Sequence, residues 1–429
     1  MIHLIRAKNP MHHTRESSQE DWNDAIQSIA AFNSSGQSLL YKMSSAGAVE
    51  NFAKGGIIES LCGRRFINWG GYGVFLLGHS NESIVSRLCN QAKMMAISSR
   101  AMPYSSCALL NKSIASILPP DMRKFTLMNT GSEAVEYAIK IARIKTGRKE
   151  IFFLEGAYHG KTMGALSVSD SFHSRGLLAG FDVGTRQVDR QNHEEVCALI
   201  AAHKPAAIII EPIQGEGGIV RIRPDYLQAV RMASAESGTL LIFDEIQCGL
   251  GRTGAQWAHL ESGASPDLLL GGKALGGGVF PVSLVAGTES AFGPVDADPL
   301  LHSSTFANSP LAASAVIGFC EEAAKIDIPS SCNKIGGEIA NSLAPYTAGR
   351  REDGAIDEIR QFGALIGLKM KNPLLAVKLL RNLMKREMIV TPCLSAPDVI
   401  RITPPANSTE AEVQAGIAVL LDALDALQQ

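Results

Sequence analysis

Short apolar runs that end in polar or glycine-rich segments recur through the middle of the chain. The clearest are residues 207–210, which precede Glu211, and residues 239–243, which precede Asp244. Both runs are too continuously apolar to have a solvated face, so each predicts a strand covered on both sides. A helical pattern over residues 225–238 lies between them and ends at a glycine suited to a C-cap. This order of strand, helix and strand predicts an α/β fold with mostly parallel strands.

Beyond residue 310 the pattern changes to long helical stretches, over residues 373–388 and 408–428, with short strand-like pieces such as residues 364–370. A second, smaller α+β domain is expected, because single cores rarely grow beyond roughly 250–300 residues. The predicted division is 1–69 for an N-terminal arm and part of the small domain, 70–310 for the large domain, and 311–429 for the C-terminal small domain. Residues 11–36 are polar and serine-rich, which suits a mobile arm or a segment that orders only against a partner subunit.

Composition and charge exclude several classes of partner. With 40 basic and 42 acidic residues, the formal charge of −2 creates no field that attracts nucleic acid or an anionic membrane. No run approaches the roughly 20 apolar residues that cross a bilayer, and the N-terminus lacks the apolar core of a signal peptide. The eight cysteines have neither CxxC pairs nor metal-like spacing with histidine. We therefore expect a soluble cytoplasmic protein with reduced thiols, no metal site, and small-molecule or protein partners.

Residues 129–133 are the first candidates for ligand chemistry. Apolar residues at helical spacing from Val135 onward indicate that a helix begins there. Gly131 lets a ligand approach the backbone, where free N–H groups and the positive end of the helix dipole suit an anion. Thr130 and Glu133 have the spacing of a capping box. An ordinary capped helix has the same pattern, so this segment alone does not establish a phosphate site.

Asp244 is the second candidate, because it ends a predicted strand at the edge where open α/β sheets place their ligands. A carboxylate buried beside a pyridine nitrogen keeps that nitrogen protonated, and the pyridinium then withdraws electrons from a carbanion at the attached substrate carbon. A structural or helix-capping aspartate is the alternative.

Lys273 is the third candidate and lies among glycines, within residues 271–278. A lysine partly shielded from water has a lowered pKa and can attack an aldehyde as a free amine. A solvated loop lysine is the alternative. A nucleotide-binding loop is disfavoured, because the segment has neither GxGxxG nor GxxxxGK[ST] spacing.

These three segments, in this order and with comparable separations, resemble the class III aminotransferases of pyridoxal 5′-phosphate (PLP) fold type I. That group contains ornithine, acetylornithine, 4-aminobutyrate and putrescine aminotransferases. The resemblance implies a large domain with a mostly parallel sheet flanked by helices, and a smaller α+β domain built from the N- and C-terminal segments. It spans nearly the whole chain, with further matches at residues 66–79, 158–167, 211–218, 241–254, 302–312 and 399–405.

The resemblance assigns catalytic roles to Lys273, as the Schiff-base lysine, and to Asp244, as the pyridinium partner. Gly131 and Ser132 match the residues that hold the cofactor phosphate. Thr305 matches the hydroxyl that reaches this phosphate from the other subunit, which implies a homodimer with shared active sites.

Further cofactor-binding residues follow from the same matches. Tyr158 corresponds to the aromatic residue stacked on the pyridine ring, Ile246 to the aliphatic residue on the opposite face, and Gln247 to the partner of the phenolic oxygen. His159 and Glu211, within the matched segments, are also predicted to be cofactor-binding.

The predicted substrate site contains Arg401, Glu216 and Tyr72. Arg401 resembles the arginine that grips a substrate carboxylate, and Glu216 the glutamate that pairs with it when no carboxylate is present. Ornithine and acetylornithine enzymes usually carry arginine where this chain has Lys161. Lys161 and the segment around Tyr72 are more similar to the putrescine-type branch of the family. This similarity favours a diamine or another ω-amine as the donor.

The implied reaction is a ping-pong transamination. A donor amine displaces Lys273, which becomes the base, and the amino group then passes to an oxo acid such as 2-oxoglutarate held by Arg401. Another PLP reaction on the same scaffold, an aminomutase or a decarboxylase, is the nearest alternative. An NAD-dependent oxidoreductase and a binding protein without catalysis are more remote.

Overall fold

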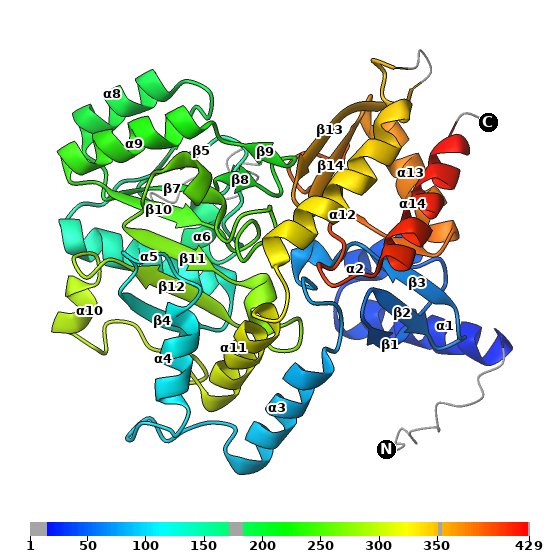
Figure 1. Cartoon of the computed structure of the whole chain (residues 1–429), viewed down its shortest axis with the longest axis horizontal. Coiled ribbons are helices and arrows are strands. Elements are labelled where there is room, and N and C mark those ends of the chain that lie inside the picture. Colours follow the sequence, from blue (N-terminus) through cyan, green and yellow to red (C-terminus); the bar gives the residue numbers. More distant parts are fainter. Residues whose placement is uncertain (1–14, 171–182, 351–353, 428–429) are drawn as a thin grey trace.

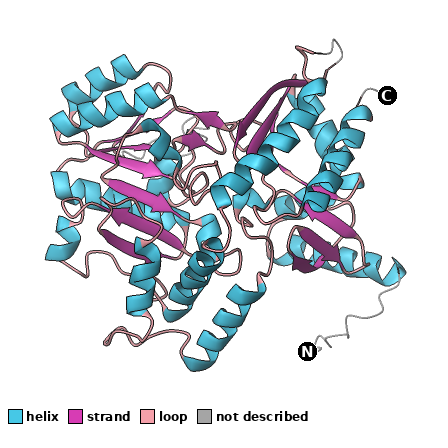
Figure 2. Ribbon diagram, in the orientation of Figure 1, coloured by secondary structure: helices cyan, strands magenta, loops and turns pink. Residues whose placement is uncertain are grey.

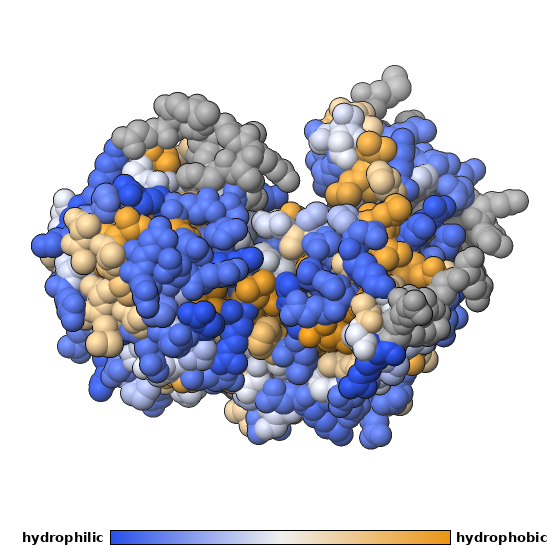
Figure 3. Space-filling model, turned by 90° about the horizontal axis from the view of Figure 1, so that it is seen from above, coloured by the Kyte–Doolittle hydropathy of each residue, from blue (hydrophilic) through white to orange (hydrophobic). Residues whose placement is uncertain are grey.

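The structure is a computed structural model that describes residues 15–170, 183–350 and 354–427. The middle of the chain forms one lobe, and segments from both ends of the chain form the other (Figure 1). Helices flank the strands in both lobes (Figure 2). Seen from above, the surface is hollowed between the lobes (Figure 3). The predicted α/β fold class is confirmed.

A seven-stranded sheet is the centre of the first lobe. Strand β10 pairs in parallel with β11 and β7, and β5 pairs in parallel with β7 and β6. Strand β12 runs antiparallel to both of its neighbours, β11 and β4. The two apolar runs of the sequence are therefore adjacent strands, β7 and β10. In spatial order the strands are β4 (Lys124–Met128), β12 (Ser283–Gly287), β11 (Leu268–Gly271), β10 (Leu240–Asp244), β7 (Ala207–Ile210), β5 (Ile151–Leu154) and β6 (Thr185–Val188).

The inner strands β5, β7, β10 and β11 are buried on both faces, which explains why they have no polar position other than Asp244 at the end of β10. In β10, Leu241 and Phe243 pack into one core cluster and Ile242 into the other, because successive side chains point to opposite faces. Helices α3 (Glu82–Met94), α4 (Cys107–Ala115), α8 (His193–His203), α9 (Pro224–Ser237) and α11 (Pro310–Ala323) contribute to the first cluster. Helices α5 (Gly131–Thr146), α6 (Met163–Ser167) and α10 (Gly293–Ala297) pack on the second.

The second lobe joins the two ends of the chain. Strand β3 pairs in parallel with β15, so a strand from each end shares one sheet, and Trp69 packs in the same cluster as the C-terminal helices. One sheet contains β1 (Glu50–Lys54), β2 (Ile57–Ser60), β3 (Arg65–Asn68) and β15 (Met388–Ile389), and the other β13 (Ile356–Phe362), β14 (Leu365–Met370), β17 (Val399–Ile402) and β16 (Thr391–Pro392). Its C-terminal helices are α12 (Ile328–Leu343), α13 (Pro373–Lys385) and α14 (Glu410–Asp425). Among the 3-10 turns, η2 (Ala258–Ser262) lies in the first lobe and η4 (Ala344–Tyr346) in the second.

The individual elements agree with the sequence pattern to within a few residues. The pattern over 225–238 corresponds to α9, which ends at Gly238 with φ 69°, a left-handed cap. The patterns over 373–388, 408–428 and 364–370 correspond to α13, α14 and β14. The positions of the domain boundaries stay a prediction.

The polar N-terminal segment is helical as far as the structure describes it, and its mobility or ordering against a partner subunit stays a prediction. From residue 15 it forms helix α1 (Arg15–Phe32) and then α2 (Ser35–Ser44), and the indole of Trp22 donates a 2.9 Å hydrogen bond to Ser45. These helices contact each other within one chain. Of the helices that the structure describes, none is long and apolar enough to span a membrane.

Candidate active site

Asp244 is the last residue of β10 and points into the space beyond the carboxyl ends of the parallel strands. Its carboxylate is 5% exposed. One oxygen lies 2.7 Å from Nδ1 of His159, and the other accepts a 3.1 Å hydrogen bond from the backbone N–H of Ile246. Because an ionised carboxylate can only accept, we assign the proton of this contact to Nδ1 of His159.

Lys273 follows β11, the neighbour of β10, and begins the 3-10 turn η3 (Lys273–Gly276). Its φ of 47° is in the left-handed region, which a residue other than glycine adopts only when its surroundings hold it there. Burial, followed by the positive charge of Arg401, lowers the pKa of Lys273 to about 8. Lys273 is therefore far more easily deprotonated than a solvated lysine.

Helix α5 presents its N-terminus to the same space. Thr130 caps it by accepting a 3.2 Å hydrogen bond from the N–H of Glu133. The return bond of the expected capping box is displaced by one residue, because Glu133 accepts from the N–H of Asn129. The first N–H groups of a helix have no partner within it, so those at Gly131 and Ser132 suit an anion.

Gly131 and Gly160 leave room for a ligand to come close to the N-terminus of α5. A Cβ on Gly131 would lie 3.0 Å from Cδ1 of Ile246, and a Cβ on Gly160 would lie 2.2 Å from Oγ of Ser132. Gly160 also has φ 133°. The sequence analysis did not select Gly160, because its need for glycine arises only from the contact with a residue 28 positions earlier.

A cavity of about 210 Å³ joins these groups. Its lining includes predicted residues from five separate parts of the sequence: Gly131, Ser132, Tyr158, His159, Glu211, Glu216, Asp244, Ile246, Gln247 and Lys273. The arrangement brings together the free N–H groups at the start of α5, which suit an anion, the buried carboxylate of Asp244 and the amine of Lys273.

Arg401, on β17 of the second lobe, adjoins the cavity through Glu216. Its side chain is fully buried, and Nη1 lies 2.5 Å from Oε1 of Glu216. Arg401 also donates to Gln247 at 3.3 Å and to Thr391 at 3.2 Å. The sequence analysis did not identify Thr391, because only the pairing of β16 with β17 brings it beside Arg401.

Tyr72 lies over Arg401, with the guanidinium carbon 5.0 Å from the ring centroid. It belongs to the 3-10 turn η1 (Gly71–Gly73) and has φ 58° and ψ 23°. Gln247 donates a 3.2 Å hydrogen bond to the backbone carbonyl of Tyr72. This contact and the cation–π contact hold Tyr72 beside Arg401 and Gln247.

Thr305 does not line the cavity of its own chain. It is exposed, on the loop that leads into α11, and its neighbour Ser304 accepts a 2.9 Å hydrogen bond from Asn129. This exposure is compatible with a role in a second copy. Lys161 is exposed as well, and its N–H donates to Ser132.

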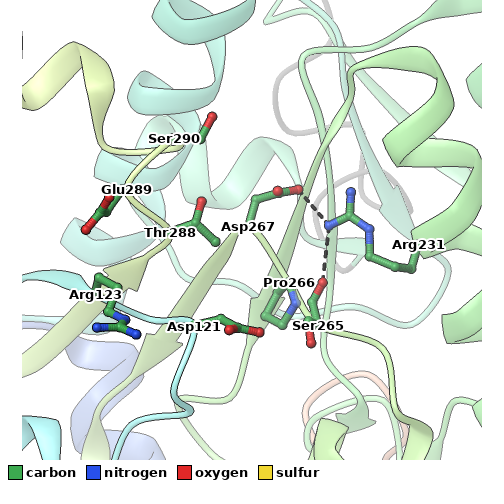
Figure 4. A pocket seen from close by; sticks show the side chains of 9 residues that line it. All are labelled: Asp121, Arg123, Arg231, Ser265, Pro266, Asp267, Thr288, Glu289 and Ser290. Atoms are coloured by element: carbon green, nitrogen blue, oxygen red, sulfur yellow. Dashed lines mark hydrogen bonds and ion pairs between the residues drawn. The ribbon is translucent and has the colours of Figure 1, made fainter.

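A larger open cavity, of about 730 Å³, lies at the amino end of β11, away from these groups (Figure 4). Its charged residues include Arg231 and Asp267, which pair at 2.8 Å. Asp267 also accepts a hydrogen bond from the backbone of Leu241. Arg231 and Asp267 thus already have structural partners. The larger volume of this cavity is therefore no reason to prefer it to the cavity beside Lys273 as the active site.

Comparisons with known proteins identify the family and show solved structures of the same fold. The family model described as aminotransferase class-III matches residues 45–424. An ornithine aminotransferase from Toxoplasma gondii ME49 is 24% identical, with a TM-score of 0.86 over 97% of this chain and 99% of that chain. A second structure of the T. gondii enzyme, with partial occupancy of PLP at its active site, is 25% identical over the same shares, with a TM-score of 0.83. A transaminase from the marine bacterium Virgibacillus is 22% identical, with a TM-score of 0.81 over 89% of this chain and 93% of that chain.

Proposed function

The chain belongs to the class-III aminotransferase family of PLP-dependent transaminases, and on that premise we propose that it transfers an amino group from an ω-amine, diamine or ω-amino acid to 2-oxoglutarate or a similar oxo acid. The observation that carries this proposal is the buried ion pair between Arg401 and Glu216. An arginine that already has a carboxylate partner leaves the pocket neutral for a donor without a nearby carboxylate. The NAD-dependent alternative is wrong, because the matched family consists of PLP-dependent transaminases.

The residues around the cavity fit PLP. The N–H groups of Gly131 and Ser132 would hold its phosphate, Asp244 its ring nitrogen, and Lys273 its aldehyde carbon. His159, bonded to Asp244, has a buried Nε2 without a protein partner among the described residues. When bound, PLP supplies an aldehyde for the donor amine and a ring that withdraws electrons from the donor carbon.

Lys273 performs the proton transfer in this proposal. Once the donor amine has displaced it, its Nζ would take the proton from the donor carbon and return it at the carbon that was the PLP aldehyde. Its pKa of about 8 keeps a usable fraction of free amine near neutral pH. The buried carboxylate of Asp244 would accept a hydrogen bond from the protonated ring nitrogen and so favour that protonated form.

Glu216 and Arg401 select the two substrates in turn. The donor enters while they are paired, and the carboxylate of the oxo acid then replaces Glu216 on the guanidinium. An exposed Lys161 in place of the arginine usual in ornithine and acetylornithine enzymes supports a donor without an α-carboxylate. An aminomutase or a decarboxylase would not require an oxo-acid acceptor.

We further propose a homodimer in which Thr305 of each copy reaches the phosphate held by the other. The exposure of Thr305 outside its own cavity supports this arrangement. A cytoplasmic location is proposed because the eight cysteines are free thiols.

The test is an absorbance titration of PLP-loaded protein with a panel of ω-amines, diamines and ω-amino acids. We expect a yellow band that one class of donor bleaches and 2-oxoglutarate restores, and no such band in Lys273→Ala. A wild-type protein that shows no band with excess PLP contradicts the proposal. A band that returns after reaction with the donor alone, without any oxo acid, favours the aminomutase or decarboxylase.

A further inference from the structure

We propose that Glu211 is a positioning residue that ties the segment carrying Tyr158 and His159 to the segment carrying Glu216. It acts through two backbone hydrogen bonds and contacts neither substrate directly. The inference rests on the roles proposed above for Tyr158, His159 and Glu216. It extends them by explaining how Glu216 can leave Arg401 without disturbing the cofactor side of the site.

Glu211 follows β7, and its carboxylate is 5% exposed. Oε1 accepts a 2.8 Å hydrogen bond from the N–H of Tyr158, and Oε2 accepts a 3.1 Å hydrogen bond from the N–H of Gly215. Each carboxylate oxygen thus has one backbone donor from a different segment. An ionised carboxylate suits two donors, whereas a carboxamide would turn an NH₂ group toward one of them.

The first bond fixes the cofactor side. Tyr158 is the predicted ring-stacking residue, and the next residue, His159, donates its own N–H to Ser169 at 2.9 Å and its Nδ1–H to Asp244. Displacing the backbone at Tyr158 would therefore also move the imidazole that holds Asp244.

The second bond fixes the substrate side. Gly215 directly precedes Glu216, and its carbonyl accepts a 3.3 Å hydrogen bond from the thiol of Cys393. A Cβ on Gly215 would lie 1.6 Å from Oε1 of Gln247, so this backbone is packed closely against the pocket. With Gly215 held on both sides, Glu216 can leave Arg401 only by turning its side chain.

The negative charge of Glu211 has a second measurable effect, on the pKa of the nitrogen at Lys273. Its negative charge raises the pKa of Lys273, although more weakly than those of Glu216 and Asp244. Burial raises the pKa of Glu211 itself to about 7, with Asp244 acting in the same direction and His159 and the two backbone bonds acting against it. Loss of this charge should lower the affinity of the nitrogen at Lys273 for a proton.

The test compares Glu211→Gln and Glu211→Asp with wild type after loading with PLP. The readouts are the visible circular dichroism of the bound cofactor and the pH at which its yellow band is half lost. In Glu211→Gln we expect weaker dichroism and a midpoint about 0.5–1 pH unit lower. Glu211→Asp keeps the charge but is too short to reach both N–H groups, so the dichroism should weaken while the midpoint stays near that of wild type.

Glu155→Gln is the matched control, because it makes the same change in an exposed side chain three residues before Tyr158. If Glu211 had only a structural role, replacing it would lower thermal stability but leave the dichroism and the pH midpoint unchanged. That result would overturn the inference. If Glu211→Gln does not fold, the test rests on Glu211→Asp. Weakened dichroism in that variant supports the inference and unchanged dichroism overturns it. If wild type shows the yellow band and both Glu211 variants match wild type in dichroism and pH midpoint, this inference alone is refuted. If wild type shows no band, the proposed function is refuted as well.

Discussion

Arg401 and Glu216 are two buried charges that stabilise each other, and separating them leaves both without a charged partner. Arg401 is fully buried and Glu216 nearly so, and removing either would leave the other charged and desolvated. The pair is suited to exchange, because a substrate carboxylate can replace that of Glu216 without leaving the guanidinium unpaired. Glu216 must then find new donors, and it already accepts a 3.0 Å hydrogen bond from the N–H of Leu394.

Arg401→Lys should raise KM for the oxo acid roughly ten- to a hundredfold, because an ammonium loses the two-pronged contact with a carboxylate. Bleaching of the yellow band by the amine donor should change less. Steady-state kinetics and single-turnover spectra separate the two effects. Arg386→Lys, in an exposed pair with Asp422, is the control. Equal losses in both half-reactions would contradict the exchange.

The lowered pKa of Lys273 predicts how the apoenzyme takes up PLP. Only the free amine attacks the aldehyde, so the rate of uptake should rise with pH through about 8 and level off above it. A Lys273 that titrates near 10.5, the ordinary value, would still be gaining rate at pH 9.5. Stopped-flow absorbance of the apoenzyme mixed with PLP measures this profile.

Helix α5 is the element on which the cofactor proposal depends most. Its N-terminus lies beside the ends of β10 and β11, and Ile246 packs against both Gly131 and Gly272. Glycine is needed at the start of this helix for close approach, whereas glycine inside a helix ordinarily only weakens it.

Gly131→Ala should therefore weaken PLP binding by about tenfold, because the new methyl group would crowd Ile246 where the phosphate approaches. Gly337→Ala, inside α12 with no atom within 4 Å of the new Cβ, is the control. It should stabilise the fold by about 0.5–1 kcal/mol and leave PLP affinity unchanged. Fluorescence titration with PLP and thermal unfolding measure both effects. Equal PLP affinity in wild type and Gly131→Ala would contradict the phosphate site.

At the scale of the whole molecule, the site lies where the two lobes meet. Lys273 and Asp244 come from the first lobe, whereas Arg401 comes from the sheet built near the C-terminus. A change in the angle between the lobes would separate Arg401 from Glu216. The proposed second copy completes the site by adding Thr305.

A mixture of Thr305→Ala and Lys273→Ala chains tests this sharing. In a mixed dimer, the Thr305→Ala chain keeps its own Lys273 and receives Thr305 from the other chain, so one complete site is restored. We expect one PLP site of wild-type affinity per mixed dimer, measured after subunit exchange. If Thr305 served its own chain, no mixture would recover wild-type affinity.

Much of the fold could be predicted because local patterns decided it. The unbroken apolar runs of β7 and β10 reflect burial on both faces of the sheet, and the glycine cap of α9 reflects a local backbone need. The ordering of residues 15–44 into α1 and α2 escaped prediction, because their stability comes partly from contact with each other and only weakly from an apolar pattern.

By itself, the sequence determined the family and the residues of the candidate site, because Lys273, Asp244 and the start of α5 lie in segments whose spacing and local chemistry can be recognised. Only the tertiary structure decided which atoms meet. The bonds from Arg401 to Thr391 and from Glu211 to both Tyr158 and Gly215 join segments that are separate along the chain. Such contacts depend on strand order and on the packing of the two lobes, which no local pattern encodes.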